Sequence, residues 1–137
     1  MPTALPIVDA NVFLRHIRQD HADQSPRATA YLLRIRRGEL VARTDTIVLA
    51  ETVYVLQSFY RMRKPAIAEA LLTIVALPNL KLPHKARLRN VFDWYVRYNL
   101  SFVDAYLAVM TREQKLPAVV SFDRNYDRIP GVARVEP

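Results

Sequence analysis

Cysteine is absent from the 137-residue chain, and glycine occurs only twice. The absence of cysteine excludes disulfide scaffolds, thiolate zinc sites and cysteine nucleophiles. The scarcity of glycine excludes the glycine-rich loops that bind nucleotide phosphates. Only three histidines are present, too few for a site rich in imidazole ligands, so a metal ion would have to be held by oxygen atoms.

Long hydrophobic runs are also missing. No apolar segment reaches the ~20 residues that cross a bilayer, and the first residues lack the order of a signal peptide. We therefore expect a cytoplasmic protein with no membrane partner. The length is that of one domain, residues 1–137, and the 51% hydrophobic content is enough for a core without covalent staples.

Positive charge is abundant. The chain has 20 Lys and Arg against 13 Asp and Glu, a net charge of +7, and most of the basic residues are arginine. Arginine suits bidentate contacts with phosphate. This balance predicts an anionic partner, with nucleic acid as the leading candidate and a merely solvated basic surface as the alternative.

Short apolar runs alternate with helical patterns along the chain. This alternation predicts an α/β fold in three layers, with a central parallel sheet of four to five short strands flanked by helices. The expected strands are residues 5–9, 40–42, 80–82, 117–122 and 132–135. The expected helices are 11–18, 24–37, from Thr44 or Asp45 to about 60, 65–77, 83–97 and 101–114. Gly38 is the expected stop signal of the second helix, and Ser101 is the expected cap at the start of the last.

Four acidic residues stand where acids are costly. Asp9 and Asp123 each follow an apolar strand, which places them at the carboxyl edge of a parallel sheet. Glu51 and Asp104 have mostly apolar neighbours three and four residues away, so each is expected on a helix face turned to the core. The alternatives are a helix cap for Asp9, a turn for Asp123, and buried salt bridges to arginine for the other two.

Carboxylates gathered at one sheet edge would need a cation to stay charged. Oxygen ligands alone suit Mg²⁺ or Mn²⁺, and such a site can activate a water for in-line attack at phosphorus. The four acids on a basic chain therefore favour hydrolysis of nucleic-acid phosphodiesters.

Five sequence segments resemble the PIN-domain family, and more closely the VapC-type toxin ribonucleases of toxin–antitoxin pairs. They are residues 8–11, 49–54, 102–108, 121–127 and 129–132. The resemblance implies a PIN fold and an endoribonuclease that depends on Mg²⁺ or Mn²⁺. It also implies that the metal-binding and catalytic acids are Asp9, Glu51, Asp104 and Asp123.

The resemblance further implies a homodimer whose cognate antitoxin is encoded by the neighbouring gene. Asn11 and Ser121 match polar positions that orient carboxylates or water, although a helix-start residue and an ordinary strand serine are equal alternatives. A groove for the antitoxin is expected along helical apolar residues that are otherwise plain core: Tyr54, Leu56, Phe59, Tyr60, Leu71, Leu72 and Ile74.

Several basic residues are candidates for RNA contacts. Arg112, two turns after Asp104, is a candidate to hold the scissile phosphate. The clusters 34–37, 61–64 and 81–89 are candidates for backbone contacts or are solvated helix ends. Asp93 is expected in a surface ion pair, and Asp127 in a turn rather than as a further metal ligand.

Two other functions remain open. A non-catalytic basic module could bind RNA or DNA with its carboxylates in structural roles. An aspartate-based phosphatase would also place acids at strand ends, but it needs an Asp two residues after the first, where this chain has Asn11.

Overall fold

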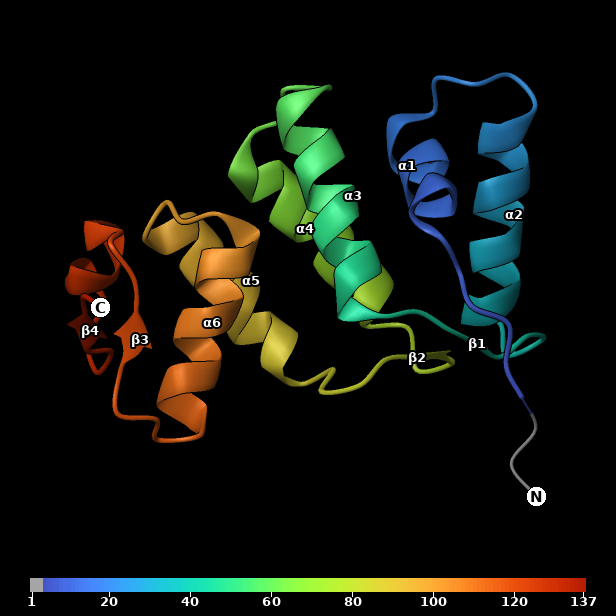
Figure 1. The fold of residues 1–137 in the computed structure, drawn as a ribbon. Helices are drawn as coiled ribbons and strands as arrows, with labels where there is room; N and C mark the ends of the chain where they lie inside the picture. Colours follow the sequence, from blue (N-terminus) through green and yellow to red (C-terminus); the bar gives the residue numbers. More distant parts are fainter. Residues whose placement is uncertain (1–3) are drawn as a thin grey trace. The chain divides into compact units, whose positions relative to one another are not determined.

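The computed structural model describes residues 4–137, in which six α-helices alternate with four short strands and one 3-10 helix (Figure 1). The chain divides into two compact units, Met1–Lys85 (unit 1) and Ala86–Pro137 (unit 2). The expectation of a single domain over 1–137 stays a prediction.

Unit 1 contains four helices and one pair of strands. Asp45 begins the third helix by accepting a hydrogen bond from Ile47 N at 3.3 Å, and Pro65 occupies the first turn of the fourth. Gly38 follows the second helix with φ +78°, as its predicted stop signal requires. The elements are α1 Ala10–Arg18, α2 Gln24–Arg36, β1 Ala42–Arg43, α3 Thr46–Ser58, α4 Lys64–Val75 and β2 Leu80–Lys81.

Unit 2 contains a pair of packed helices followed by the second pair of strands. Ser101 caps its second helix by accepting a hydrogen bond from Asp104 N at 3.1 Å, as predicted. The helix expected over 83–97 begins four residues later, at Arg87. The elements are α5 Arg87–Arg97, α6 Phe102–Glu113, β3 Val119–Val120, the 3-10 helix η1 Arg124–Arg128 and β4 Arg134–Val135.

Strand pairing is parallel in both units, which confirms the α/β class. In unit 1, β1 pairs with β2 in the register Ala42 to Leu80, and Ile7 forms a parallel bridge to Arg43. In unit 2, β3 pairs with β4. The strand expected over residues 5–9 is reduced to this single bridge, and each of the other strands has two residues.

The two apolar runs at residues 5–9 and 117–122 are only partly buried. Val8 is buried, but Ile7 is 61% exposed, Val120 65% and Phe122 72%. Side chains alternate between the two faces of a strand, so the helices of one unit cover only every second residue.

Each unit has its own buried core. Phe13, Ile35 and Leu49 are fully buried in unit 1, where α1 packs against both α2 and α3. Val91, Phe92 and other apolar residues are fully buried in unit 2, where α5 packs against α6. Within residues 4–137, no helix combines the length and the apolar character needed to cross a bilayer.

Candidate functional site

Asp9 lies where the first extended segment meets α1. Its carboxylate accepts a hydrogen bond from Ala10 N at 2.7 Å and so caps the helix, as the structural alternative predicted. The segment before it is fixed by two bonds: Val8 N donates to Arg43 O at 2.8 Å, and the buried Thr44 hydroxyl donates to Val8 O at 3.0 Å. A carboxylate has about four acceptor positions, so the cap leaves Asp9 able to bind a cation.

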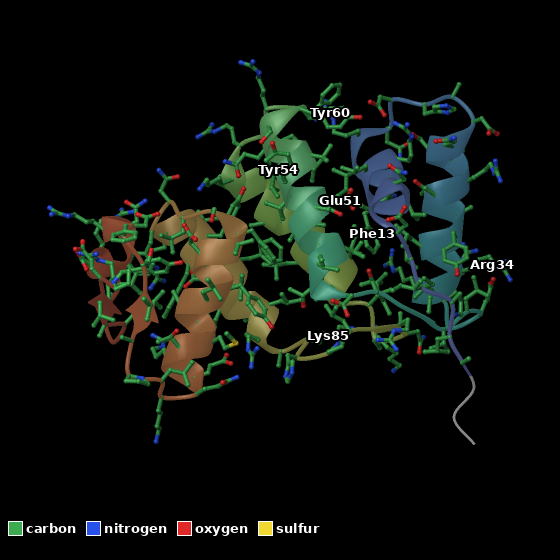
Figure 2. The ribbon with its side chains drawn as sticks, viewed as in Figure 1. Phe13, Arg34, Glu51, Tyr54, Tyr60 and Lys85 are labelled. Atoms are coloured by element: carbon green, nitrogen blue, oxygen red, sulfur yellow. The ribbon has the colours of Figure 1, made fainter. Side chains whose placement is uncertain are left out.

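The prediction that Glu51 lies on a helix face turned to the core is wrong. Glu51 is exposed and projects from α3 (Figure 2). Its neighbours one turn away, Ile47 and Tyr54, are 75% and 71% exposed. The core side of α3 is formed by other residues, including Leu49 and Val53. An exposed carboxylate needs no partner, so the burial argument does not apply to Glu51.

Asp104 lies in the first turn of α6 and is half-buried, as its apolar neighbours predicted. The hydroxyl of buried Tyr126 donates a hydrogen bond to Asp104 Oδ1 at 3.0 Å. Burial raises the pKa of Tyr126 far above its usual value, and the bond to Asp104 and the charges of Asp104 and Asp123 raise it further. The hydroxyl is therefore a permanent donor that holds one oxygen of Asp104.

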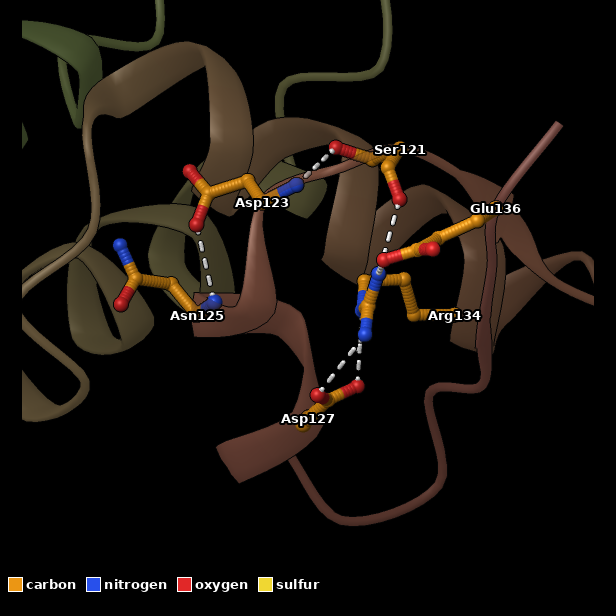
Figure 3. A network of polar contacts seen from close by, with 6 residues as sticks. All are labelled: Ser121, Asp123, Asn125, Asp127, Arg134 and Glu136. Atoms are coloured by element: carbon orange, nitrogen blue, oxygen red, sulfur yellow. Dashed lines mark hydrogen bonds and ion pairs between the residues drawn. The ribbon is translucent and has the colours of Figure 1, made fainter.

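Asp123 follows β3 and begins the 3-10 helix η1. Its backbone N–H donates to Ser121 Oγ at 2.9 Å, and its Oδ1 accepts from Asn125 N at 2.9 Å (Figure 3). Ser121 thus sets the backbone at Asp123. The Asp123 side chain is exposed, with its second carboxylate oxygen outside the turn.

Asp127 is engaged by arginine. The Arg134 guanidinium donates to both carboxylate oxygens of Asp127, Nε at 3.0 Å and Nη2 at 3.2 Å (Figure 3). The hydrogen bond to Arg134 lowers the pKa of Asp127. Asp127 is therefore held by Arg134 and belongs to the turn, as expected.

Ion pairing separates the acidic residues of the chain into two groups. Within residues 4–137, seven of the 13 acids pair with an arginine: Asp20, Asp23, Glu39, Asp93, Glu113, Asp127 and Glu136. The acids outside these pairs are Asp9, Asp45, Glu51, Glu69, Asp104 and Asp123. The predicted salt bridges from Glu51 and Asp104 to arginine are thus absent from the described residues, whereas the predicted surface pair of Asp93 is present, at 3.4 Å from Arg97.

The four candidate acids are divided evenly between the units. Asp9 and Glu51 belong to unit 1, and Asp104 and Asp123 to unit 2. Among the described residues, neither unit alone brings together three acidic or histidine side chains that could hold a metal ion. In unit 2, the charges of Asp104 and Asp123 both act on the Tyr126 hydroxyl.

The family model described as PIN domain matches residues 7–132, nearly the whole chain. The chain belongs to the PIN domain family. No curated protein matches it.

PIN domains have a three-layer α/β/α fold, so the predicted fold class is confirmed. They are generally metal-dependent nucleases and typically use divalent metals such as Mg²⁺. The donor set of this PIN domain fits such an ion, because its candidate ligands are carboxylates that pair with no arginine in the described part of the chain, and Mg²⁺ prefers oxygen ligands.

Two further predicted residues lie elsewhere in the PIN domain. Asn11 is exposed in the first turn of α1, two residues after Asp9. Arg112 lies in the last turn of α6, and its guanidinium stacks on the Trp94 ring, 4.2 Å from the ring centre. Arg112 lies eight positions after Asp104, about 12 Å along the helix axis, and its contact with a scissile phosphate stays a prediction.

Part of the basic cluster 81–89 has a structural role. Lys85 Nζ donates to Leu80 O at 2.9 Å, and Arg87 Nε pairs with Glu113 Oε2 at 2.8 Å. The predicted antitoxin groove also changes: Leu56, Leu71 and Ile74 are buried and belong to the core. Tyr54 and Phe59, at 71% and 74% exposure, remain on the surface.

The sequence pattern does not reveal Thr44 or Tyr126 as supports of the acids. Thr44 resembles a helix cap in the sequence, but its hydroxyl bonds to the carbonyl before Asp9. Tyr126 is one residue of the PIN-like segment 121–127, with no pattern of its own. A buried tyrosine needs a partner for its hydroxyl, which is a signal in principle, but the sequence alone does not say which acid meets it.

Proposed function

We propose that this PIN domain is a metal-dependent endoribonuclease in which Asp9, Glu51, Asp104 and Asp123 together hold Mg²⁺ or Mn²⁺. We propose further that it is the toxin of a toxin–antitoxin pair, acting in the cytoplasm as a homodimer that a cognate antitoxin inhibits. Family membership supports the nuclease class, and the VapC-like sequence segments support the toxin assignment.

The observation that carries the metal site is the ion pairing of the acids. The chain has 20 basic residues for 13 acids, so arginine partners are not scarce. Seven acids nevertheless have such a partner, whereas within residues 4–137 the four candidates have none, a property that they share with Asp45 and Glu69. Like carboxylates can share a site in their charged form only with a cation between them. Among the acids without an arginine partner, the resemblance to the PIN family selects Asp9, Glu51, Asp104 and Asp123 as the proposed ligands.

The chain's own residues prepare the carboxylates for this role. Thr44 fixes the backbone before Asp9, Tyr126 holds Asp104 Oδ1, and Ser121 sets the turn that presents Asp123. Each contact leaves carboxylate oxygens free on the acid that it positions. A ligand held in place before binding loses less conformational entropy when the cation arrives.

A divalent cation in this site would lower the pKa of a bound water and stabilise the charge that develops at phosphorus. The positive charge of the chain attracts the RNA backbone, which the acids alone would repel. The family resemblance implies products with a 5′-phosphate and a 3′-hydroxyl.

Asp104→Asn tests the nuclease directly. Incubation of the purified chain with labelled single-stranded RNA in Mg²⁺ is expected to give cleavage that EDTA stops. Asp104→Asn should lower the rate by about 10²-fold or more, because the loss of a carboxylate charge weakens the binding of the cation that stabilises the transition state. The control is Asp93→Asn, which removes an aspartate paired with Arg97 on the surface and should leave cleavage unchanged.

Two outcomes would contradict the proposal: full activity of Asp104→Asn, or cleavage that persists in EDTA. RNA binding without cleavage would favour the non-catalytic binding module instead. Hydrolysis of small phosphate esters would favour the phosphatase. The toxin role is tested separately by looking for a short neighbouring gene whose product binds the chain and relieves growth arrest on co-expression.

A further inference from the structure

A cleft of about 510 Å³ lies within unit 1, between the first turns of α1 and the first two turns of α2. These helices pack against each other side by side (Figure 1). The cleft is lined by Asn11 and Arg15 from α1 and by Gln24, Arg27 and Tyr31 from α2, together with two small apolar residues. Its volume lies in the range of about 300–1,000 Å³ that is typical of ligand sites.

The lining has positive charge and no acid. Arg15 Nε donates to Gln24 Oε1 at 2.8 Å, which joins lining residues of the two helices. The acids that pair with the two arginines, Asp20 at 3.7 Å and Asp23 at 3.2 Å, stand outside the lining. Pairs as exposed as Arg27–Asp23, with side chains 76% and 69% exposed, contribute little free energy and exchange readily for another anion.

The remaining lining residues suit a nucleotide. Tyr31 is half-buried and contributes an aromatic ring to the cleft wall, and aromatic rings stack with any base. Asn11 and Gln24 supply amide groups that can donate to and accept from a base edge or a 2′-hydroxyl. The cleft therefore combines the charge, the aromatic surface and the polar groups that single-stranded RNA requires.

The position of the cleft connects it to the proposed metal site. Asp9 caps α1, and Asn11 lies in the first turn of the same helix, so one end of the cleft lies two residues from a candidate ligand. An RNA strand that passes Asp9 would meet Arg15 six residues, or about 9 Å, further along α1.

We propose that this cleft binds the RNA strand beside the cleavage site, with Arg15 and Arg27 on phosphates and Tyr31 against a base. The inference rests on the proposed function for its choice of RNA. It adds the surface that receives the substrate, which none of the predicted basic clusters contains.

The test measures binding without cleavage. Fluorescence anisotropy of a 5′-labelled, mixed-sequence 12-nucleotide RNA is recorded in EDTA at several salt concentrations. The double variant Arg15→Gln/Arg27→Gln should bind at least tenfold more weakly. The slope of log K against log[salt] should fall by about 1.4, since each lost phosphate contact accounts for about 0.7 on a single strand.

Arg34→Gln is the matched control. Arg34 is also an exposed arginine of α2 in an ion pair, at 3.4 Å from Glu39, but it lies outside the cleft. Its affinity and salt slope should equal those of the wild type. The single variant Arg27→Gln, at a highly exposed position that does not threaten folding, should account for about half of the change in slope.

Two substitutions of Tyr31 distinguish stacking on its ring from hydrogen bonding by its hydroxyl. Tyr31→Leu keeps an apolar side chain and should weaken binding about fivefold or more, whereas Tyr31→Phe keeps the ring and should bind like the wild type. Circular dichroism melting of each variant shows whether it is folded under the assay conditions.

The cleft assignment is overturned if folded Arg27→Gln and the folded double variant bind RNA as the wild type does. It is also overturned if Arg34→Gln loses as much affinity, or if a 12-residue polyglutamate peptide binds the cleft arginines more tightly than RNA does. If the variants bind RNA more weakly but the wild type never cleaves RNA, the cleft proposal is supported and the nuclease proposal is refuted. The two proposals can therefore fail independently.

Discussion

At the scale of single residues, the hydroxyl of Tyr126 is the contact with the most specific consequence. It donates to Asp104 at 3.0 Å from a buried position. Tyr126→Phe removes this donor and keeps the ring, so we expect the free energy of unfolding to fall by about 1 kcal/mol. Urea denaturation at neutral pH measures the change, where the raised pKa of Tyr126 keeps the wild-type hydroxyl protonated.

Tyr98→Phe is the control for that measurement, because no hydrogen bond joins the Tyr98 hydroxyl to another described residue. A double-mutant cycle with Asp104→Ala then isolates the pair. An additive cycle, in which the two single losses sum to the double loss, would show that the hydroxyl and the carboxylate do not interact.

The contrast between Asp104 and Glu51 shows what residue spacing can predict. Both acids have apolar neighbours one turn away, yet only Asp104 is partly buried, because only its neighbours Leu100 and Ala108 face the core. Around Glu51, the apolar Ile47 and Tyr54 are themselves exposed. Periodicity identifies residues that share a helix face, but packing decides which face is buried.

At the scale of elements, Asp9 combines two roles that substitution can separate. Asparagine caps a helix about as well as aspartate, whereas alanine does not. We expect Asp9→Asn to keep the wild-type stability and lose RNA cleavage. Asp9→Ala should lose cleavage and also about 1 kcal/mol of stability. Thermal denaturation and the cleavage assay measure the two effects on the same samples.

Asp45→Asn provides the comparison, since Asp45 is also an unpaired aspartate that caps a helix, α3, but is not a proposed ligand. It should retain both stability and cleavage. If Asp9→Asn cleaves RNA at the wild-type rate, Asp9 acts only as the cap of α1 and not as a metal ligand.

Helices were easier to predict than strands for a physical reason. Helix ends depend on local signals, and Asp45, Gly38, Pro65 and Ser101 each act at or within a few residues of the predicted boundary. Strands of two residues have no such signals. Their existence depends on a partner far along the chain, as when Ala42 pairs with Leu80. The parallel class was therefore predictable, and the lengths and burial of the strands were not.

At the scale of the whole molecule, the four candidate acids come from both units, and the proposal requires them to share a cation. Binding to the folded state raises its stability by RT ln(1 + [L]/Kd), about 1.4 kcal/mol at a tenfold excess over Kd. For a chain of this size, that corresponds to a rise in Tm of about 4–6 °C. We expect this rise when Mn²⁺ is added to the wild type without RNA, as measured by differential scanning calorimetry.

Substitutions in each unit test whether the four carboxylates form one site. If the carboxylates act as one site, then Asp9→Asn in unit 1 and Asp104→Asn in unit 2 should each abolish the rise, although both chains melt near the wild-type temperature in EDTA. Asp45→Asn should keep the full rise. A rise abolished by substitutions in only one unit would assign the cation to that unit's acids alone, and the proposed four-carboxylate site would be wrong. If Asp9→Asn and Asp104→Asn each abolish the rise in Tm, a bound ion rather than arginine compensates the charges of the four carboxylates, although the chain has arginine in excess.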